Sequence, residues 1–245
     1  MKDYLLDIVQ HTHGLGVINL IKITGDATST QINAFDQATK TVVLNAEFKA
    51  PVADFVGTFG MPNLDRLNTI LNLPVYKDDA KITVSRQTDT AGNEVPSGIN
   101  FENKEGDFKN NYRFMSEQVV TQKLKTPKFK GVNWHIEFEP SAAAIMRLKM
   151  QAQANAEETV FQAKTDGGDL KFMFGDHSTH SGNFVFEPNV KGQLKRAWSW
   201  PVNTVIGILG LTGDKVMKIS DDGAAMITVN SGIATYNYIL PAQSK

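Results

Sequence analysis

Two histidines in one polar segment are the first candidates for chemistry in this 245-residue sequence. His177 and His180 lie within Gly175–Gly182 together with Asp176 and Ser178, and these residue types can ligate a metal or form a Ser/His/Asp arrangement. The same composition is typical of a β-hairpin turn, and no Gly-x-Ser-x-Gly motif accompanies it. We therefore predict a hairpin tip here, between two strands, rather than a catalytic or metal site.

Two further histidines, His11 and His13, lie at the end of a predicted helix. Side chains two residues apart on a helix diverge by about 200° and cannot share a ligand, whereas a histidine suits the negative end of the helix dipole. We therefore predict a capping role for them.

Aspartates gather in several predicted turns, and none of these turns has the spacing of a calcium loop. They lie at 78–79, 166–169 and 221–222. No phosphate-binding glycine motif is present, and the absence of cysteine excludes thiolate metal sites and cysteine nucleophiles. The sequence thus predicts no catalytic residue, no metal site and no cofactor, and a protein that is not an enzyme.

Composition indicates a folded chain with little net charge. The sequence has 25 basic and 26 acidic residues, a formal charge of -1 and 41% hydrophobic residues. This is enough apolar material for one large domain or two smaller ones. No apolar run approaches the roughly 20 residues of a membrane span, and no signal peptide is visible, so we expect a soluble, cytoplasmic protein. Binding nucleic acid by bulk attraction is disfavoured, although basic groups could still gather on one surface.

The elements that must position these residues are mostly strands. Alternating or β-branched segments predict strands at 20–24, 31–35, 41–48, 81–85, 98–102, 112–115, 159–164, 170–174, 183–187, 216–220, 225–230 and 235–240. Apolar residues at helical spacing predict four short helices, at 3–13, 63–73, 141–155 and 202–211. In the helix at 141–155, Ile145, Leu148 and Ala152 are expected to point inward.

The order of the elements predicts a duplication. Each half reads as helix, strands, helix, strands, and residues 68–71 match 203–206, with Asp79 matching Asp214. We therefore predict an N-terminal domain at 1–117, a lysine-rich extended connector at 118–131, and a similar C-terminal domain at 132–245. The outer helix faces carry scattered Arg, Lys and amide groups, which could touch phosphates without reading bases.

Four segments resemble the DNA polymerase sliding clamps. They are residues 59–71, 77–82, 216–227 and 236–242. The similarity is to the trimeric, two-domain type, represented by proliferating cell nuclear antigen and the processivity clamps of large tailed phages, and the length looks more like the phage members. The resemblance implies an α+β fold of two similar DNA-clamp domains, each with two short helices packed on antiparallel sheets, assembling into a closed ring.

The resemblance also implies function and partners. It implies a homotrimeric ring that encircles double-stranded DNA without sequence specificity, tethers the replicative DNA polymerase for processivity and is opened by a clamp loader. A phage-encoded clamp would act in the host cytoplasm and would not engage a membrane. The implied DNA-facing residues are Arg66, Arg147, Lys149, Gln151, Lys195 and Arg196. The implied pocket for a partner peptide comprises Leu124, Tyr238, Ile239, Leu240 and Pro241.

One departure from the clamp pattern and two alternative functions stand against this interpretation. The first and fourth predicted helices contain no Lys or Arg, so the basic lining of a channel is thin. A β-rich viral structural protein, of tail or virion, would also lack catalytic motifs and would form larger or open-ended assemblies. A hydrolase using Asp176, His177 or His180 is the third possibility. We also expect charged substitutions at Leu240 and Pro241 to abolish polymerase stimulation and leave the ring intact.

Overall fold

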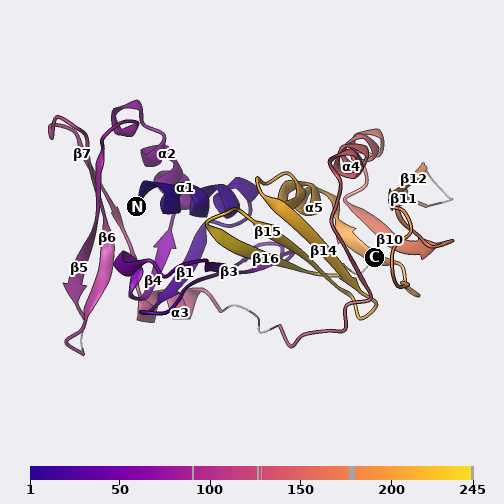
Figure 1. Ribbon diagram of the computed structural model, residues 1–245, viewed down its shortest axis with the longest axis horizontal. Helices are drawn as coiled ribbons and strands as arrows, with labels where there is room; N and C mark the ends of the chain where they lie inside the picture. Colours follow the sequence, from indigo (N-terminus) through magenta and orange to yellow (C-terminus); the bar gives the residue numbers. More distant parts are fainter. Residues whose placement is uncertain (90, 126, 128, 177–179, 244–245) are drawn as a thin grey trace. The chain divides into compact units, whose positions relative to one another are not determined.

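The computed structural model describes residues 1–89, 91–125, 127, 129–176 and 180–243 (Figure 1). The chain forms two compact units. The first unit comprises residues 1–38, 44–127 and 231–236, and the second comprises 39–43, 128–230 and 237–245. The units are therefore not simple halves of the sequence, because each takes a short segment from the other half.

The first unit contains three α-helices among its described residues, and its strands form two sheets. Its helices are α1 (Lys2–His11), α2 (Leu64–Leu71) and α3 (Glu117–Lys123), with short 3-10 turns at His13–Leu15, Ala53–Phe55 and Pro74–Tyr76. Its strands are β1 (Leu20–Gly25), β2 (Thr30–Phe35), β3 (Val43–Phe48), β4 (Gly57–Pro62), β5 (Lys81–Thr88), β6 (Glu94–Glu102), β7 (Lys109–Arg113) and β8 (Met115–Ser116).

The second unit repeats this composition. Its helices are α4 (Ala142–Ala154) and α5 (Val202–Leu209). Its strands are β9 (Ile136–Phe138), β10 (Val160–Asp166), β11 (Asp169–Gly175), β12 (Ser181–Glu187), β13 (Trp198–Pro201), β14 (Asp214–Ser220), β15 (Ala224–Asn230) and β16 (Ala234–Pro241), of which residues 234–236 belong to the first unit.

Strand order shows that the two units are copies of one architecture. In the first unit the strands lie in the order β8-β4-β1-β2-β3, with a separate sheet β5-β6-β7. In the second unit the corresponding orders are β13-β10-β11-β12 and β9-β14-β15-β16, so the two units differ by the short strands β8 and β9. Antiparallel pairing joins β1 to β2 and to β4, and likewise β10 to β11 and to β13. The predicted α+β class with antiparallel sheets and few helices is thereby confirmed.

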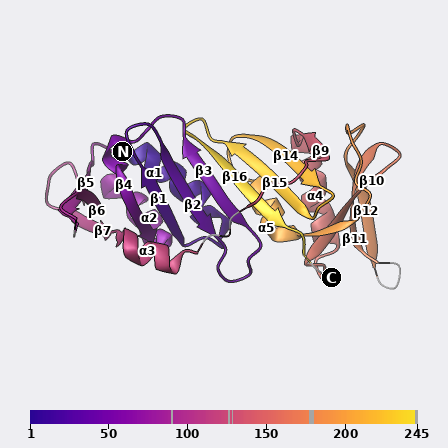
Figure 2. The ribbon, with the colours of Figure 1, turned by 90° about the horizontal axis from the view of Figure 1, so that it is seen from below.

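Each unit buries one face of its helices against sheet residues. In the first unit, α1 packs beside α2, and Figure 2 shows both helices behind β1, β2 and β4. The predicted apolar stripe of α2 is buried as expected; it consists of Leu64, Leu67, Ile70 and Leu71. In the second unit, α4 packs beside α5, and a stack of phenylalanines fills the core under the sheet. Phe172 lies with its ring centroid 4.2 Å from that of Phe186 and 4.4 Å from that of Phe161.

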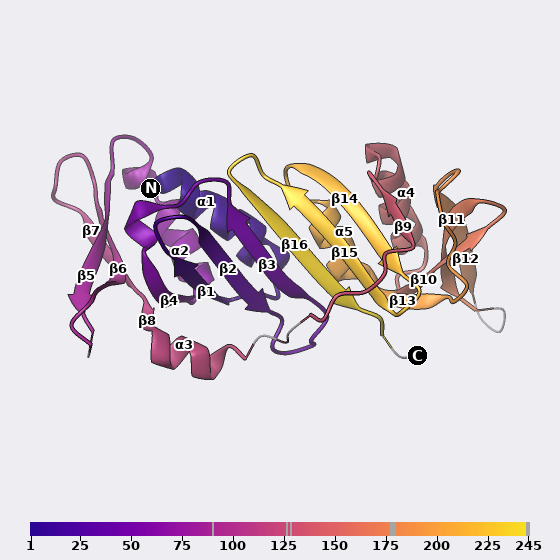
Figure 3. The ribbon, with the colours of Figure 1, turned by 60° about the horizontal axis from the view of Figure 1, so that its bottom comes forward.

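Three predictions about local structure are wrong. The connector is not extended from its start, because Glu117–Lys123 forms helix α3 (Figure 3). Strands β4, β9 and β13 lie in segments for which no strand was predicted. The matched tetrapeptides are also out of register, since residues 68–71 end α2 while residues 203–206 begin α5. Apolar residues recur every three to four positions on a helix, so a shift of about one turn preserves the match.

Boundary differences are small elsewhere. Helix α1 begins at Lys2, one residue before the predicted start, so it does contain a lysine. The Lys2 ammonium donates to the carbonyls of Tyr76, at 2.6 Å, and Lys77, at 2.8 Å. Among the described residues, no helix is both long enough and apolar enough to cross a membrane.

Candidate nucleic-acid interface

Helix α4 offers the most basic helix surface among the described residues. Its N-terminus is fixed by Ser141, whose side-chain oxygen accepts a hydrogen bond from the Ala144 N–H at 3.1 Å. Ala144 and Leu148 are buried, while the predicted inward residues Ile145 and Ala152 are only half-buried. The buried side therefore lies about one residue away from the predicted stripe.

The predicted DNA-facing residues of α4 point in different directions. Lys149 is exposed, between Met146, which is 53% exposed, and Met150, which is 62% exposed. Arg147 is also exposed, but its guanidinium donates to the Val185 carbonyl on β12 at 3.3 Å. Gln151 is half-buried. Its amide lies directly over Gly182 of β12, where a Cβ atom would collide with it. Lys149 is thus the α4 cation that is free to meet a ligand, and Gln151 belongs to the packing against β12.

Lys195 and Arg196 lie together, but beside the β14–β15 turn rather than on a helix. The Asp221 carboxylate accepts the backbone N–H groups of Lys195, at 3.1 Å, and Arg196, at 3.0 Å. The Arg196 guanidinium carbon lies 5.9 Å from the centre of the Trp198 ring, and the Trp198 indole donates to the Asp221 carbonyl at 2.8 Å. Both cationic side chains remain exposed on a loop that is held by these bonds.

The hydrogen bonds from the backbone N–H groups of Lys195 and Arg196 also favour the ionised form of Asp221. Partial burial alone would raise the pKa of this carboxyl group. The backbone N–H groups of Arg196 and Lys195, together with the charges of His135 and Arg196, outweigh it and hold the pKa below its usual value. Asp221 therefore stays ionised as the anchor of this loop.

Arg66 is the predicted DNA-facing residue of the first unit. It is exposed on α2, next to the exposed Asp65. The exposed face of α1 adds another carboxylate, Asp3, and the two uncharged residues Leu6 and Gln10. The exposed faces of α1 and α2 in the first unit therefore carry two carboxylates against one guanidinium, in contrast to α4, which carries Arg147 and Lys149 and no acidic residue.

The predicted peptide pocket consists mostly of core residues. Leu124 is buried in the first unit, and Tyr238, Ile239 and Leu240 are buried in the second, while Pro241 is exposed. Leu240 is 0% exposed, so a charged residue there would disrupt the sheet itself. A charged substitution at Leu240 would therefore also affect the fold of the chain, so Pro241, which is exposed, is the suitable position for this test.

The histidine and aspartate candidates find structural roles. Strands β11 and β12 form the predicted hairpin around the His180 segment, and residues 177–179 lie outside the described part of the chain. His11 ends α1 as predicted, but it is buried: its Nδ1 lies 2.9 Å from the Asp7 carbonyl oxygen, and its ring stacks on Tyr236. Within the described residues, no group of three or more His, Asp or Glu side chains is placed to hold a metal ion.

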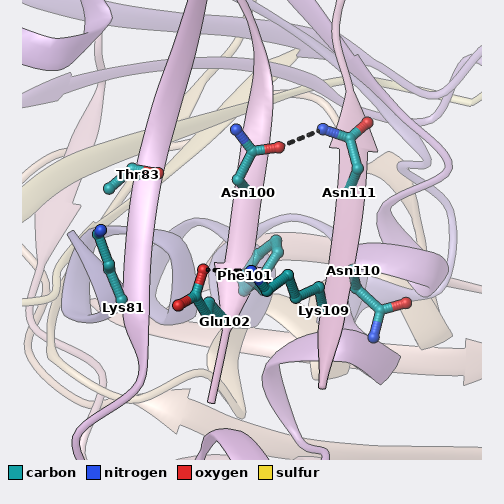
Figure 4. A pocket seen from close by; sticks show the side chains of 8 residues that line it. All are labelled: Lys81, Thr83, Asn100, Phe101, Glu102, Lys109, Asn110 and Asn111. Carbon is teal, nitrogen blue, oxygen red and sulfur yellow. Dashed lines mark hydrogen bonds and ion pairs between the residues drawn. The ribbon is translucent and has the colours of Figure 1, made fainter. Parts of the chain in front are cut away.

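A shallow cavity of about 400 Å³ lies on the β5-β6-β7 sheet, and several of its polar side chains already bond to one another. The Asn111 amide donates to the Asn100 side chain at 2.7 Å, and Lys109 pairs with Glu102 at 3.2 Å, as Figure 4 shows. Because these groups already pair across neighbouring strands, the cavity offers a ligand little beyond Lys81 and Thr83.

Two units with the same order of their main strands, each presenting a pair of short helices, define a duplicated clamp-type architecture. No protein-family model matches the sequence, and neither does any curated protein. The structure, in contrast, is similar to a chain described as A. fulgidus proliferating cell nuclear antigen (PCNA) bound to the C-terminal region of FEN-1. The TM-score is 0.69 at 12% identity, covering 100% of this chain and 96% of that chain.

PCNA from Thermococcus kodakaraensis is a second similar structure. It gives a TM-score of 0.67 at 11% identity and covers 98% of this chain and 97% of that chain. The fold of the whole chain is therefore that of the PCNA sliding clamps, as the sequence resemblance implied.

Proposed function

We propose that this protein is a non-catalytic sliding clamp that encircles duplex DNA and confers processivity on a replicative DNA polymerase. The observation that supports this best is the PCNA-like fold over the full length of the chain, with both units present. Fold similarity at this identity does not by itself transfer function, so the proposal rests also on the surfaces below. A phage origin and action in the host cytoplasm are part of the proposal.

A closed ring requires two complementary edges on each subunit. Strand β7 ends the three-stranded sheet and β12 ends the four-stranded sheet. Antiparallel or parallel pairing of β7 of one copy with β12 of the next would satisfy both edges, and this head-to-tail contact closes if three copies complete a full rotation. We accordingly propose a homotrimer, with the domains at 1–117 and 132–245 joined by the connector at 118–131.

The DNA contact would be topological rather than adhesive. Lys149 and Arg147 on α4 and Arg66 on α2 are our candidates for phosphate contacts on the helix faces, with Gln151 in a supporting position. Lys195 and Arg196 would contact DNA only from their loop beside the β14–β15 turn. A ring with so few cations would slide, because each phosphate contact is weak and readily exchanged.

Partners would dock on the outside of such a ring. The A. fulgidus clamp is described with the C-terminal region of FEN-1 bound. By analogy, we propose that the polymerase and the clamp loader use a peptide segment that contacts the connector after Leu124 and the C-terminal strand Tyr238–Pro241. Since Tyr238, Ile239 and Leu240 face the core, Pro241 and the backbone of this strand would form the accessible part.

Cysteine cross-linking tests the ring directly, because the chain has no cysteine of its own. A variant carrying both Asn111→Cys in β7 and Asn183→Cys in β12 should oxidise to a covalent species of three times the 27.0 kDa subunit mass. Each single variant is the matched control and should give no closed species. Loading on circular DNA should survive high salt, and linearising the DNA should release the protein.

The opposite results discriminate the alternatives. A ladder of unlimited length would indicate the open assembly of a structural protein. A monomer by light scattering at high concentration, with no gain in polymerase processivity, would refute the clamp.

A further inference from the structure

A second surface of the first unit has the features of a binding groove. It lies between helix α3 and the adjoining ends of β5 and β6, and its volume is about 640 Å³. Figures 1 and 3 draw α3 at the edge of this unit opposite α1 and α2. The groove is therefore separate from the helix faces that are candidates for DNA contact.

Close packing fixes the helical wall of the groove. Val120 of α3 rests on Gly60 of β4, where a Cβ atom would lie only 2.7 Å from the valine Cγ2. Glycine at this position lets the helix approach the strand, and the burial of Val120 and Leu124 holds it there. Gln118, Thr121 and Gln122, spaced at i, i+3 and i+4, consequently share the face that lines the groove.

Part of the polar lining of this groove, its glutamine side chains, is unpaired, unlike the polar groups of the cavity in Figure 4. The side-chain amides of Gln87, Gln118 and Gln122 make no hydrogen bond with any residue in the described part of the chain. Each offers one carbonyl acceptor and two N–H donors. Val95 and Pro96 supply an apolar part of the lining. An extended peptide, which presents N–H and C=O groups at regular intervals, matches such a set of amides.

The negative charge of the groove favours a peptide that carries a cationic side chain. Among the residues that the structure describes, Asp89 and Glu117 line it, and no Lys or Arg does. The Asp89 carboxylate accepts the N–H groups of Asn93 and Ala91, both at 2.8 Å. These bonds, that of Asn93 foremost, hold the pKa of Asp89 below its usual value although burial opposes them. Two carboxylates repel nucleic acid and attract a cationic side chain.

We propose that the α3 groove binds an extended, lysine- or arginine-bearing segment of a partner protein. Glu117 and Asp89 receive its cationic side chain, and the three glutamine amides pair with its backbone. This contact goes beyond the proposed clamp function. It is distinct from the peptide site at Tyr238–Pro241 and requires neither DNA nor a ring.

Peptide binding to the full chain tests the proposal. The probes are two fluorescein-labelled octapeptides, one alternating Lys and Thr and the other alternating Glu and Thr, measured by fluorescence anisotropy in 50 mM salt. We expect the lysine peptide to bind about tenfold more tightly than the glutamate peptide. Glu117→Gln should weaken it about threefold, and Gln122→Lys should weaken it more. Glu157→Gln, which removes an exposed carboxylate of the second unit, is the matched control and should have no effect.

Specific outcomes would overturn the inference. Equal affinities for the two peptides would do so, as would equal losses in Glu117→Gln and Glu157→Gln with circular dichroism unchanged. If Glu117→Gln instead altered only the mass measured by light scattering, the occupant would be a second copy of this chain. Processivity on circular DNA is measured with the same variants: equal peptide affinities with unchanged processivity would refute the groove alone and leave the clamp proposal standing.

Discussion

Helices α1 and α4 occupy equivalent positions in the order of elements of the two units. They differ in their buried residues and in the charge of their exposed faces. On α1 a carboxylate is buried: Asp7 accepts hydrogen bonds from the Tyr236 hydroxyl at 2.7 Å and the Ser231 hydroxyl at 3.1 Å. On α4 the fully buried residues are apolar, Ala144 and Leu148. Helix α1 thus adds a buried polar anchor to its apolar contacts through Leu5 and Ile8, whereas the buried helical residues of α4 are apolar alone.

The exposed faces of α1 and α4 differ in charge. The exposed face of α1 carries Asp3, Leu6 and Gln10, whereas that of α4 carries Lys149 between Met146 and Met150. Acidic side chains outnumber basic ones in the first unit, and the reverse holds in the second. The duplication has therefore kept the strand order while the charges of the two copies have diverged. In a ring, the second unit would make the stronger contacts with phosphates.

The largest expected effect is the loss of the apolar anchor. Leu148→Ala should lower the free energy of unfolding by about 3 kcal/mol, because it removes buried methyl groups and leaves a cavity under α4. Urea unfolding followed by circular dichroism measures this. Met150→Ala, on the exposed side of the same helix, should change the stability by less than about 0.5 kcal/mol. Equal effects in the two variants would show that α4 is not anchored by Leu148.

The polar anchor should contribute somewhat less. Asp7→Asn places an amide N–H₂ group beside the hydroxyl donors of Tyr236 and Ser231, so at least one buried polar group loses its partner. We expect a loss of about 2 kcal/mol in urea unfolding. Asp3→Asn, on the exposed face of α1, is the control and should be close to neutral. If Asp7→Asn were also neutral, the contrast between the two anchors would disappear.

The charge difference between the helix faces predicts unequal DNA binding. Lys149→Gln should weaken binding to a short duplex two- to fivefold and reduce the slope of log K against log salt by about 1. Arg66→Gln should have a smaller effect, because the adjacent Asp65 already offsets its charge. Lys104→Gln is a control outside these faces, since Lys104 pairs with Asp79 at 3.1 Å. Fluorescence anisotropy between 25 and 150 mM salt gives all three slopes, and a larger loss in Arg66→Gln would reverse the proposed asymmetry.

The smallest expected effect concerns the Asp221 loop of the second unit. Because its folded pKa is lowered, Asp221 contributes stability above the unfolded pKa of about 3.9 and loses it as the pH falls through the lower, folded value. Asp221→Asn should therefore cost under about 1 kcal/mol at pH 7, an effect limited by solvent screening, and the difference from the parent protein should vanish in strong acid. Urea unfolding from pH 7 to pH 3 measures it. Glu157→Gln should show no such convergence, and a constant difference for Asp221→Asn would contradict the assignment.

Part of the fold could be predicted because its signals are local. The alternation in Lys81–Ser85 and the spacing of Leu64, Leu67, Ile70 and Leu71 specify a strand and a helix without reference to the rest of the chain. Strand β4 could not be found in this way, because Gly57 and Gly60 give it little apolar alternation and its partner β1 supplies the pairing. Helix α3 was missed for a similar reason, since one buried valine seated on Gly60 positions it.

For the candidate site, the structure decides which predicted residues are exposed. Lys149 and Arg66 are exposed on helices. Gln151 is half-buried against Gly182 of β12, and Leu240 is fully buried, which their sequence context did not indicate. The roles of Asp7 and Asp221 depend on partners more than 20 residues away along the chain, which no local pattern reveals.

By itself, the sequence determined that strands outnumber a few short helices, that the order of elements repeats, and that no catalytic motif is present, since each of these depends on residue types and short spacings. Tertiary structure alone decided which short segments each unit takes from the other half, which cations remain free, and which polar groups are left unpaired in the α3 groove. These properties follow from long-range packing, in which a side chain's environment is set by residues that are distant along the chain.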